Sequence, residues 1–160
     1  MRRIVILGCA GAGKSTFARR LGEHLAAPVI CLDAIWRPEW DKDDLSRFRR
    51  LMDQAHRADA WVSDGNFAQA TFDLRLPRAD LIVWLERPRL LCAWRAVMHV
   101  LGRGEGHRAA DVVTVLRFIW GFDRVNRPLI EALRLAHGPG APVVRLTSDA
   151  AMEHFLAEAG

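Results

Sequence analysis

The stretch that decides the fold of this chain is Gly8-Cys9-Ala10-Gly11-Ala12-Gly13-Lys14-Ser15, which follows directly on the apolar run Ile4-Val5-Ile6-Leu7. It fits the pattern G-x-x-x-x-G-K-[ST], the P-loop, in which a strand leads into a phosphate-binding loop and the loop opens a helix. The glycines let successive backbone N–H groups curl around a phosphate, and the positive end of the following helix attracts the anion. The stretch therefore predicts a site for the phosphates of a nucleotide.

Each residue of this loop has an expected part in the site. Lys14 can reach the β- and γ-phosphates and is the first candidate catalytic residue, and the Ser15 hydroxyl can ligate Mg²⁺. The predicted nucleotide-binding residues are Gly8, Cys9, Ala10, Gly11, Ala12, Gly13, Lys14, Ser15 and Thr16.

Composition limits the class of protein. The 160 residues are 51% hydrophobic with a formal net charge of +4, which predicts one globular domain over residues 1–160. No apolar run approaches the roughly 20 residues that span a membrane, and the run after Arg2 and Arg3 is too short for a secretion signal. We therefore expect a cytoplasmic protein without a membrane partner. The three cysteines have no spacing typical of a zinc site or a disulfide framework.

Alternating apolar patterns predict an α/β fold with a parallel sheet. Short apolar runs predict five strands, and amphipathic spacing predicts helices between them, with a kink or restart at Pro128 within the helix 111–136. The expected strands are 2–7, 29–32, 60–63, 81–85 and 142–146, and the expected helices are 14–26, 43–58, 68–76, one from 88, 111–136 and 149–158.

Carboxylates follow three of the predicted strands. Because ligands of such sheets bind at the carboxyl ends of the strands, Asp33, Asp64 and Glu86 are all candidates for the site. Asp33 could accept a proton from a substrate hydroxyl or help to hold Mg²⁺, and it could also be a turn residue. Asp64 is the favoured Mg²⁺ partner, with Glu86 as its competitor, because a carboxylate after a strand is where a Walker-B-type group stands.

Arginines and glycines in the second half predict a lid over residues 99–127. Arg103 and Arg108 flank a glycine-rich loop, and arginines before and after it could stabilise a transferring phosphoryl group while the lid excludes water. Arg95 and Arg124 are the favoured catalytic arginines, although a solvated basic face would show the same pattern. Arg117 and Arg127 share the helical face of Arg124.

The tryptophans divide into two groups. Trp61, Trp84, Trp94 and Trp120 lie at apolar spacings and are expected in the core. Trp36 and Trp40 lie in a polar segment after Asp33, where they could line an acceptor pocket or simply pack that segment.

With these segments in hand, the chain resembles the small P-loop kinases related to adenylate kinase, and within them the bacterial subgroup labelled DNA topology modulation proteins. The resemblance is carried by 4–16, by 29–33 with Trp36 and Trp40, by 61–67, by 81–88 and by the pair Trp94-Arg95. It implies a nucleotide-kinase-like three-layer fold, a five-stranded parallel sheet in the order 2-3-1-4-5 and an Arg-bearing lid. It also implies ATP and Mg²⁺ as cofactors, with the adenine near Thr147-Ser148-Asp149.

The sequence thus predicts an ATP-dependent kinase whose partner is a small-molecule phosphoryl acceptor. The chain departs from adenylate kinases in lacking a long acceptor-binding insertion, which does not favour a nucleoside monophosphate as the acceptor. The alternative is an ATPase or nucleotide-binding regulatory module acting on a protein or DNA partner, with Glu86 activating water. No nucleic-acid-binding motif is present, and a monomer and a homodimer are both compatible with the sequence.

Overall fold

A computed structural model describes residues 1–36, 42–102 and 109–159, with the side chains of 42–43 and 109–111 outside that description. Its centre is a parallel sheet whose strands follow the order β2-β3-β1-β4-β5. This confirms the α/β fold class and the strand order that the resemblance implies. The strands are β1 (Arg3–Gly8), β2 (Val29–Cys31), β3 (Trp61–Asp64), β4 (Leu81–Leu85) and β5 (Val143–Leu146).

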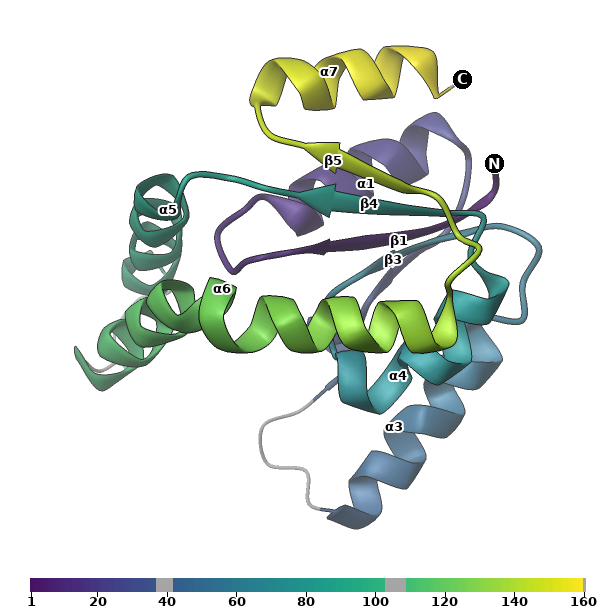
Figure 1. Ribbon diagram of the computed structural model, residues 1–160, viewed down its shortest axis with the longest axis horizontal. Coiled ribbons are helices and arrows are strands. Elements are labelled where there is room, and N and C mark those ends of the chain that lie inside the picture. Colours follow the sequence, from purple (N-terminus) through teal and green to yellow (C-terminus); the bar gives the residue numbers. More distant parts are fainter. Residues whose placement is uncertain (37–41, 103–108, 160) are drawn as a thin grey trace.

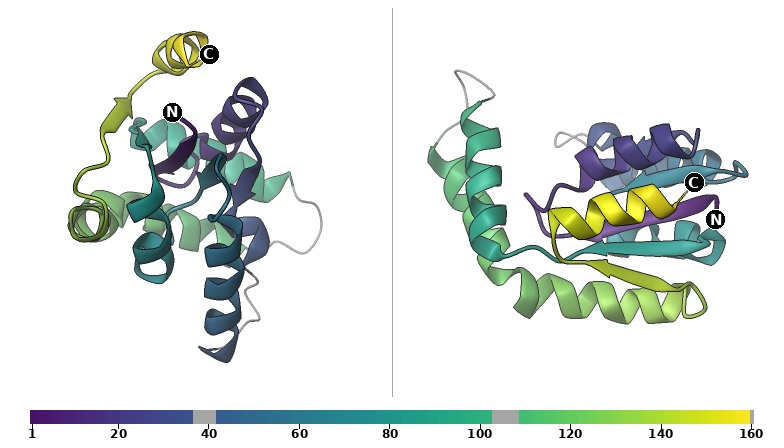
Figure 2. Two further views of the ribbon diagram at one scale, coloured as in Figure 1. Left: turned by 90° about the vertical axis from the view of Figure 1, so that its right-hand side faces the viewer. Right: turned by 90° about the horizontal axis from the view of Figure 1, so that it is seen from above.

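The helices complete three layers (Figures 1 and 2). One face of the sheet is covered by α1 and α7 and the other by α3, α4 and α6, while α5 stands beside α6 beyond the carboxyl ends of the strands. The helices are α1 (Lys14–His24), α2 (Leu32–Ile35), α3 (Lys42–Ala55), α4 (Ala68–Arg75), α5 (Arg89–Leu101), α6 (Ala109–His137) and α7 (Asp149–Glu158), and a short 3₁₀ helix η1 spans Leu76–Arg78.

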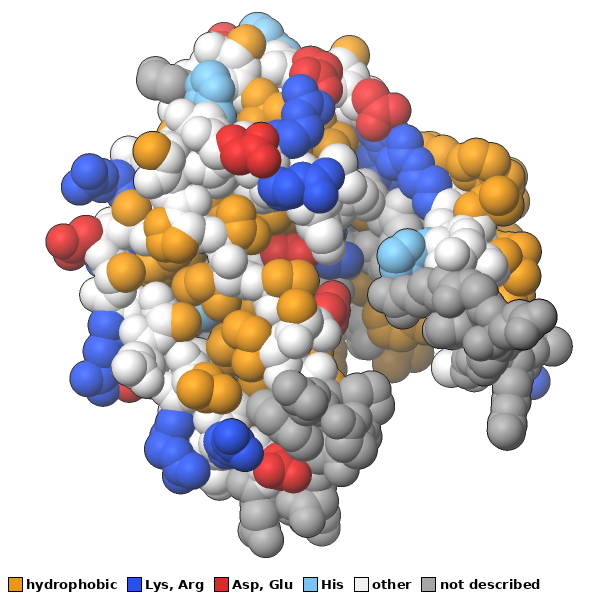
Figure 3. All heavy atoms as spheres, turned by 180° about the vertical axis from the view of Figure 1, so that it is seen from behind, with side chains coloured by type: hydrophobic (Ala, Val, Ile, Leu, Met, Phe, Trp, Pro, Cys, Tyr) orange, Lys and Arg blue, Asp and Glu red, His pale blue; other side chains and the backbone are white. Residues whose placement is uncertain are grey.

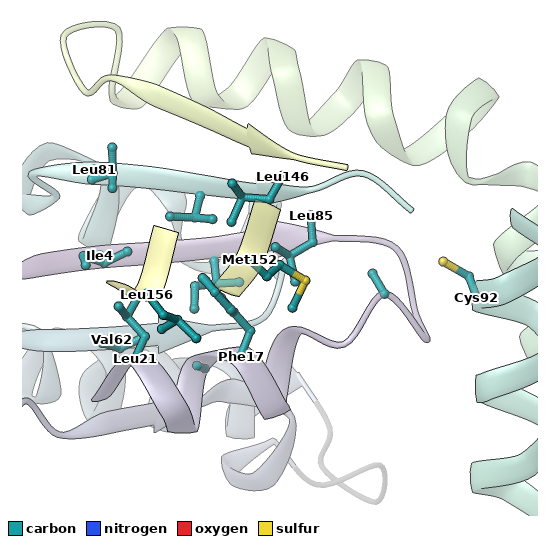
Figure 4. Close-up of a cluster of buried hydrophobic side chains, with 14 of the residues drawn as sticks. Ile4, Phe17, Leu21, Val62, Leu81, Leu85, Cys92, Leu146, Met152 and Leu156 are labelled. Carbon is teal, nitrogen blue, oxygen red and sulfur yellow. The ribbon is translucent and has the colours of Figure 1, made fainter. Parts of the chain in front are cut away.

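The central strands are buried on both faces, as expected for a parallel sheet between helical layers. On one face, Phe17 and Leu21 of α1 and Met152 and Leu156 of α7 pack against β1, β3 and β4 (Figure 4). On the other face the buried side chains include Phe48, Met52, Phe72, Trp84, Phe122 and Ile130. This double burial fixes the sheet and therefore the positions of the loops at its carboxyl edge.

Two of the four expected core tryptophans are buried and two are not. Trp61 and Trp84 are buried, whereas Trp94 is 64% exposed and Trp120 53% exposed, so the expectation was wrong for the last two. The buried face of α5 consists of the small residues Cys92, Ala93 and Ala96. Small side chains let α5 approach the phosphate loop and α6 closely, and this turns Trp94 outward.

Some details of the elements also differ from the prediction. Asp33 lies within the short helix α2 instead of opening an irregular segment. Helix α6 runs from Ala109 to His137 without a restart at Pro128, although it curves in Figure 2. Proline removes one backbone donor, and a long helix supported by packing along its length can absorb that loss. Among the described residues, none of the helices combines the length and apolar character that crossing a bilayer requires.

A buried polar network lies beneath β3. Nδ1 of His56 is 2.7 Å from the carbonyl oxygen of Met52, which can only accept, so Nδ1 carries the proton. Nε2 of His56 then accepts a hydrogen bond from the Ser63 hydroxyl at 2.9 Å. Burial lowers the pKa of His56 to about 4, so the imidazole is neutral at pH 7.

The free energy of unfolding should therefore depend on His56 between about pH 6.5 and pH 4. Between these two pH values, His56 is protonated in the unfolded chain but neutral in the folded protein. The contribution of His56 to the free energy of unfolding is therefore fully present above about pH 6.5 and is lost as the pH falls. Between pH 7.5 and pH 5, the wild type should lose about 2 kcal/mol more than His56→Gln, whose amide can occupy the same two hydrogen bonds without titrating. Urea unfolding at both pH values measures this, and equal losses in the two proteins would contradict the assignment.

Candidate nucleotide and acceptor site

The phosphate loop connects β1 to α1 and has the backbone of an anion nest. Gly11 and Gly13 have φ of 74° and 94°, in the left-handed region that glycine adopts without strain. No side chain caps the first turn of α1, so its N–H groups face the loop. Nζ of Lys14 donates to the carbonyl oxygen of Cys9 at 3.0 Å, which holds this ammonium over the loop.

The neighbouring strand holds the loop in place through Asn66. Its Oδ1 accepts a hydrogen bond from the Gly8 N–H at 3.2 Å, and its Nδ2 donates to the Gly8 carbonyl at 2.9 Å. The carboxamide thus pairs with the backbone of Gly8 as another strand would. Asn66 belongs to the segment 61–67 that carries the family resemblance, but no sequence pattern predicted a part for it in the site.

Two carboxylates stand beside the phosphate loop, as the strand-end rule predicted. Asp33 lies on α2 at the wall of a cavity, and burial raises its pKa, with the nearby Asp64 adding to the effect and Lys14 and Arg75 opposing it. Asp64 ends β3 and is 1% exposed. Its Oδ2 accepts a long hydrogen bond from Sγ of Cys31 at 3.7 Å, and its Oδ1 is buried with no hydrogen-bond partner.

The unpartnered Oδ1 of Asp64 fits the chemistry of a magnesium site. A buried carboxylate oxygen without a donor is costly, and Mg²⁺ or a water molecule in its shell would satisfy it. In kinase sites Mg²⁺ takes one or two protein ligands, its waters and phosphate oxygens. Within the described residues no three His, Cys, Asp or Glu side chains are grouped to hold a metal by themselves. The residues that would hold Mg²⁺ together with a nucleotide are Ser15 and Asp64.

Arg75, which was not predicted from the sequence, is fully buried near the two carboxylates. Its guanidinium donates to Ser63 Oγ at 3.1 Å, to the Gly65 carbonyl at 2.6 Å and to the Asn66 carbonyl. Burial lowers its pKa to about 9, while Asp64 and Asp33 oppose the shift, so it is charged at pH 7. No sequence pattern marks it, because Arg75 occupies an ordinary position on an otherwise apolar face of α4.

A cavity of about 670 Å³ extends from the phosphate loop toward α4 and α6. In the space-filling view, a hollow separates the body of the molecule from the projecting end of α5 and α6 (Figure 3). The cavity is lined by Ala10, Gly11, Gly13, Lys14, Ser15 and Thr16 of the loop, by Asp33, by Asn66, Phe67, Ala68 and Gln69, by Arg95 and His99, and by Phe118, Asn126, Leu129 and Ile130 of α6. Asp64 is buried and is not among the lining residues.

The two favoured lid arginines have different surroundings. Arg95 lines the cavity, and its Nη1 lies 3.6 Å from where a Cβ would stand on Gly13. Arg124 and Arg117 are exposed and line no described cavity. Arg103 and Arg108 lie outside the described residues. The structure therefore brings Arg95 to the phosphate loop and leaves Arg124 away from it.

Glu86 belongs to a separate ion-pair network. It pairs with Arg127 of α6 and Arg145 of β5, and both guanidinium groups lie over the ring of Trp84, at 5.6 Å and 5.3 Å from its centroid. Glu86 lines a second cavity of about 350 Å³ and is absent from the wall of the first. Of the two competing carboxylates, Asp64 is therefore the one that lies close enough to Asp33 to raise its pKa, whereas Glu86 shares the second cavity with Cys9 of the phosphate loop.

The segments expected to surround the acceptor and the adenine are also placed. Trp36 packs edge-on against Phe48, with ring centroids 5.2 Å apart, and it does not line the cavity. Trp40 lies outside the described residues. After β5, Asp149 pairs with Arg87 at 2.7 Å and with Arg95 at 3.6 Å. The segment that the resemblance associates with the adenine therefore lies near Arg95.

Comparison with known proteins places this chain in a structural class. No protein-family model matches it. Its fold is similar to shikimate kinase from Acinetobacter baumannii in complex with shikimate, with a TM-score of 0.63 and 19% identity over 96% of this chain and 88% of that one. A gluconokinase from Sinorhizobium meliloti 1021 gives a TM-score of 0.59 and 20% identity over 99% and 89% of the two chains. The fold is therefore that of the small P-loop kinases.

Sequence similarity points to one relative in particular. The chain is 32% identical to adenylate kinase from Mycobacterium leprae over 124 residues, which is 72% of this chain and 62% of that protein. The chain thus spans about three fifths of the length of this relative. The chain is a distant relative of adenylate kinase, and it shares its fold with the shikimate kinase and the gluconokinase named above.

The contact between the phosphate loop and α5 gives a sharp prediction. A Cβ on Gly11 would lie 2.1 Å from the Cys92 carbonyl oxygen, and the left-handed φ of Gly11 disfavours any side chain. Gly11→Ala should lower the free energy of unfolding by about 2–4 kcal/mol and weaken ATP binding, because the loop or α5 must shift. Urea unfolding and ATP titration measure the two effects.

Gly121→Ala is the matched control for Gly11→Ala. Gly121 lies within α6, and a Cβ there would meet nothing within 4 Å. This variant should gain about 0.5–1 kcal/mol of stability from better helix propensity and keep its ATP affinity. Equal behaviour of the two alanine variants would show that the Gly11 contact is not a constraint.

Proposed function

We propose that this protein is an ATP- and Mg²⁺-dependent kinase that phosphorylates a hydroxyl group of a small molecule. The observation that carries the proposal is the single cavity that joins Lys14, Asp33 and Arg95 at one end to Asn126 of α6 at the other. A phosphate loop alone would serve any nucleotide-binding protein. A carboxylate at the loop and room for a second molecule beyond it are what phosphoryl transfer to an acceptor requires.

The residues then divide the work of the reaction. The loop N–H groups and Lys14 bind the phosphates of ATP, and Arg95 stabilises the charge on the transferring group. Asp33 orients the acceptor hydroxyl and takes its proton, a role suited to a carboxylate that lines the cavity and has a raised pKa. Ser15 and Asp64 would hold Mg²⁺, which neutralises charge on the β- and γ-phosphates. Arg124 was predicted to help Arg95, and its exposed position offers no support for that role.

The observations do not favour the alternative of an ATPase or regulatory module acting on a protein or DNA. That hypothesis needs Glu86 to activate water at the γ-phosphate. Glu86 is held by Arg127 and Arg145 and lines the second cavity, so it has a structural explanation. Membership of the DNA topology modulation subgroup remains a prediction from the sequence resemblance.

The roles of the carboxylates can be tested by comparing Asp33→Asn with Glu86→Gln. Asp33→Asn should lower acceptor-dependent kcat/KM about 10²–10⁴-fold, because it removes the proton acceptor while keeping the shape of the side chain. Glu86→Gln should stay within about threefold of the wild type. ADP release is measured against a panel of nucleosides, nucleotides, sugars and hydroxy acids, with Lys14→Ala as the blank. Loss of activity in Glu86→Gln alone would favour the ATPase hypothesis.

The proposed metal position predicts an altered magnesium requirement in Asp64→Asn. The amide is isosteric but neutral, so the Mg²⁺ concentration for half-maximal activity should rise about tenfold or more. Asp73→Asn is the control, because Asp73 is an exposed carboxylate paired with Arg49 and remote from the cavity wall. An unchanged Mg²⁺ dependence in Asp64→Asn would place the metal elsewhere.

A further inference from the structure

We propose that the acceptor is an electrically neutral hydroxyl compound with a flat apolar face. The inference rests on the proposed kinase function and concerns the part of the cavity lined by residues outside the phosphate loop and α5. This part includes Phe67 and Gln69 at the start of α4 and Phe118, Asn126 and Leu129 on α6. We call these five residues the acceptor wall.

Charge is distributed unevenly along the cavity. The two arginine and lysine side chains among the described lining residues, Lys14 and Arg95, both lie at the phosphate loop, where the donor phosphates would use them. The third basic lining residue is His99, which belongs to α5, the helix of Arg95, and not to the acceptor wall. The acceptor wall contains only carboxamide and hydrocarbon side chains. The one acidic side chain among the described lining residues is Asp33, which would repel a carboxylate or phosphate on the acceptor. An anionic acceptor would therefore lose its hydration without gaining a described cation.

The arginines near the acceptor wall are engaged elsewhere. Arg75 is fully buried and does not line the cavity, and its Nη1 and Nη2 donate to Ser63, Gly65 and Asn66 while its Nε is buried without a described partner. Arg49 pairs with Asp73 and also donates to the Ala70 carbonyl. A carboxylate-binding pocket usually presents a free guanidinium fork, and the described part of this wall has none.

The apolar part of the wall is aromatic. Phe118 is 39% exposed, and its ring lies 5.7 Å from that of Phe122. Phe67 has a φ of 37°, a left-handed backbone that a bulky residue rarely adopts, and its ring packs on Phe48 with centroids 5.4 Å apart. Such a strained backbone persists only where the surrounding structure imposes it. Here the strained conformation of Phe67 places its aromatic side chain at the cavity. A flat ligand face would bury itself against these rings.

The polar side chains of the acceptor wall, Gln69 and Asn126, are uncharged and free to form hydrogen bonds with a ligand. Asn66 uses both ends of its carboxamide on Gly8, whereas Gln69 and Asn126 make no hydrogen bond to another described residue. Each can donate and accept one or more hydrogen bonds, which suits hydroxyl, amide or ring-nitrogen groups. Neutral hydroxylated rings and nucleosides both carry such groups. The two classes of compound share a flat ring with uncharged hydrogen-bonding groups at its edge.

The transfer step balances with ATP as the co-substrate. The acceptor hydroxyl oxygen forms a bond to the γ-phosphorus as the bond from that phosphorus to the β,γ-bridging oxygen breaks. The hydroxyl proton passes to Asp33 and then to solvent. The products are ADP and a phosphate monoester of the acceptor.

The test compares matched pairs of neutral and anionic acceptors with the whole protein, ATP and Mg²⁺. The pairs are methyl shikimate with shikimate, glucose with gluconate, and adenosine with adenosine monophosphate. Phosphorylated product is measured by mass spectrometry, and kcat/KM by ADP release. We expect the neutral member of the productive pair to exceed its anionic partner at least tenfold. Comparing the sugar pair with the nucleoside pair identifies which class of neutral compound is the acceptor.

A charge introduced into the wall supplies the second measurement. Asn126→Arg should shift the ratio of neutral to anionic kcat/KM at least tenfold toward the anionic member, because it adds the missing cation. Val125→Arg adds the same charge one residue away, at a position that is 66% exposed and outside the cavity, and should leave the ratio unchanged.

The outcomes separate the inference from the proposed function. If wild-type protein phosphorylates the anionic members better, the inference fails while the kinase function stands. If no member of any pair yields a phosphorylated product, the kinase function fails and the inference with it. An identical ratio in Asn126→Arg and Val125→Arg would also overturn the inference, because charge at the wall would then not select the acceptor.

Discussion

The site depends on one buried interaction, the guanidinium of Arg75 bonded to the backbone carbonyls of Gly65 and Asn66. These bonds fix the turn after β3, and the side chain of the same Asn66 then pairs with Gly8 at the entrance to the phosphate loop. The buried cation also lies close enough to Asp33 and Asp64 to influence both carboxylates. One side chain thus sets the geometry of the loop and moderates the repulsion between two acids.

The parallel sheet brings the residues of the site together at one edge. Because all five strands point the same way, the ends of β1, β2 and β3 meet at one edge, with Cys31 paired in register with Asp64. The buried faces of the strands leave little freedom for their ends to move. Helices α5 and α6 then bring Arg95 and the acceptor wall to the same edge from a distant part of the chain.

Local sequence patterns predicted the fold and the donor half of the site better than the acceptor half. The loop at 8–15 and the carboxylates Asp33 and Asp64 could be found because each follows an apolar strand. Arg75, Asn66 and Asn126 could not, because their importance comes from tertiary contacts between distant segments. Trp94 shows the limit of periodicity: helical spacing identifies an apolar stripe, but the close approach of small residues decided which side of α5 is buried.

The contact of Gly11 with the backbone of α5 has a consequence for kinetics. Helix α5 touches the donor loop at Cys92 and carries Arg95, and it packs against α6, which carries Phe118 and Asn126. In the proposed reaction, donor and acceptor share one continuous helical wall. A displacement of that wall alters the surroundings of both molecules together, so the Michaelis constants for ATP and for the acceptor will vary in concert across substitutions in α5.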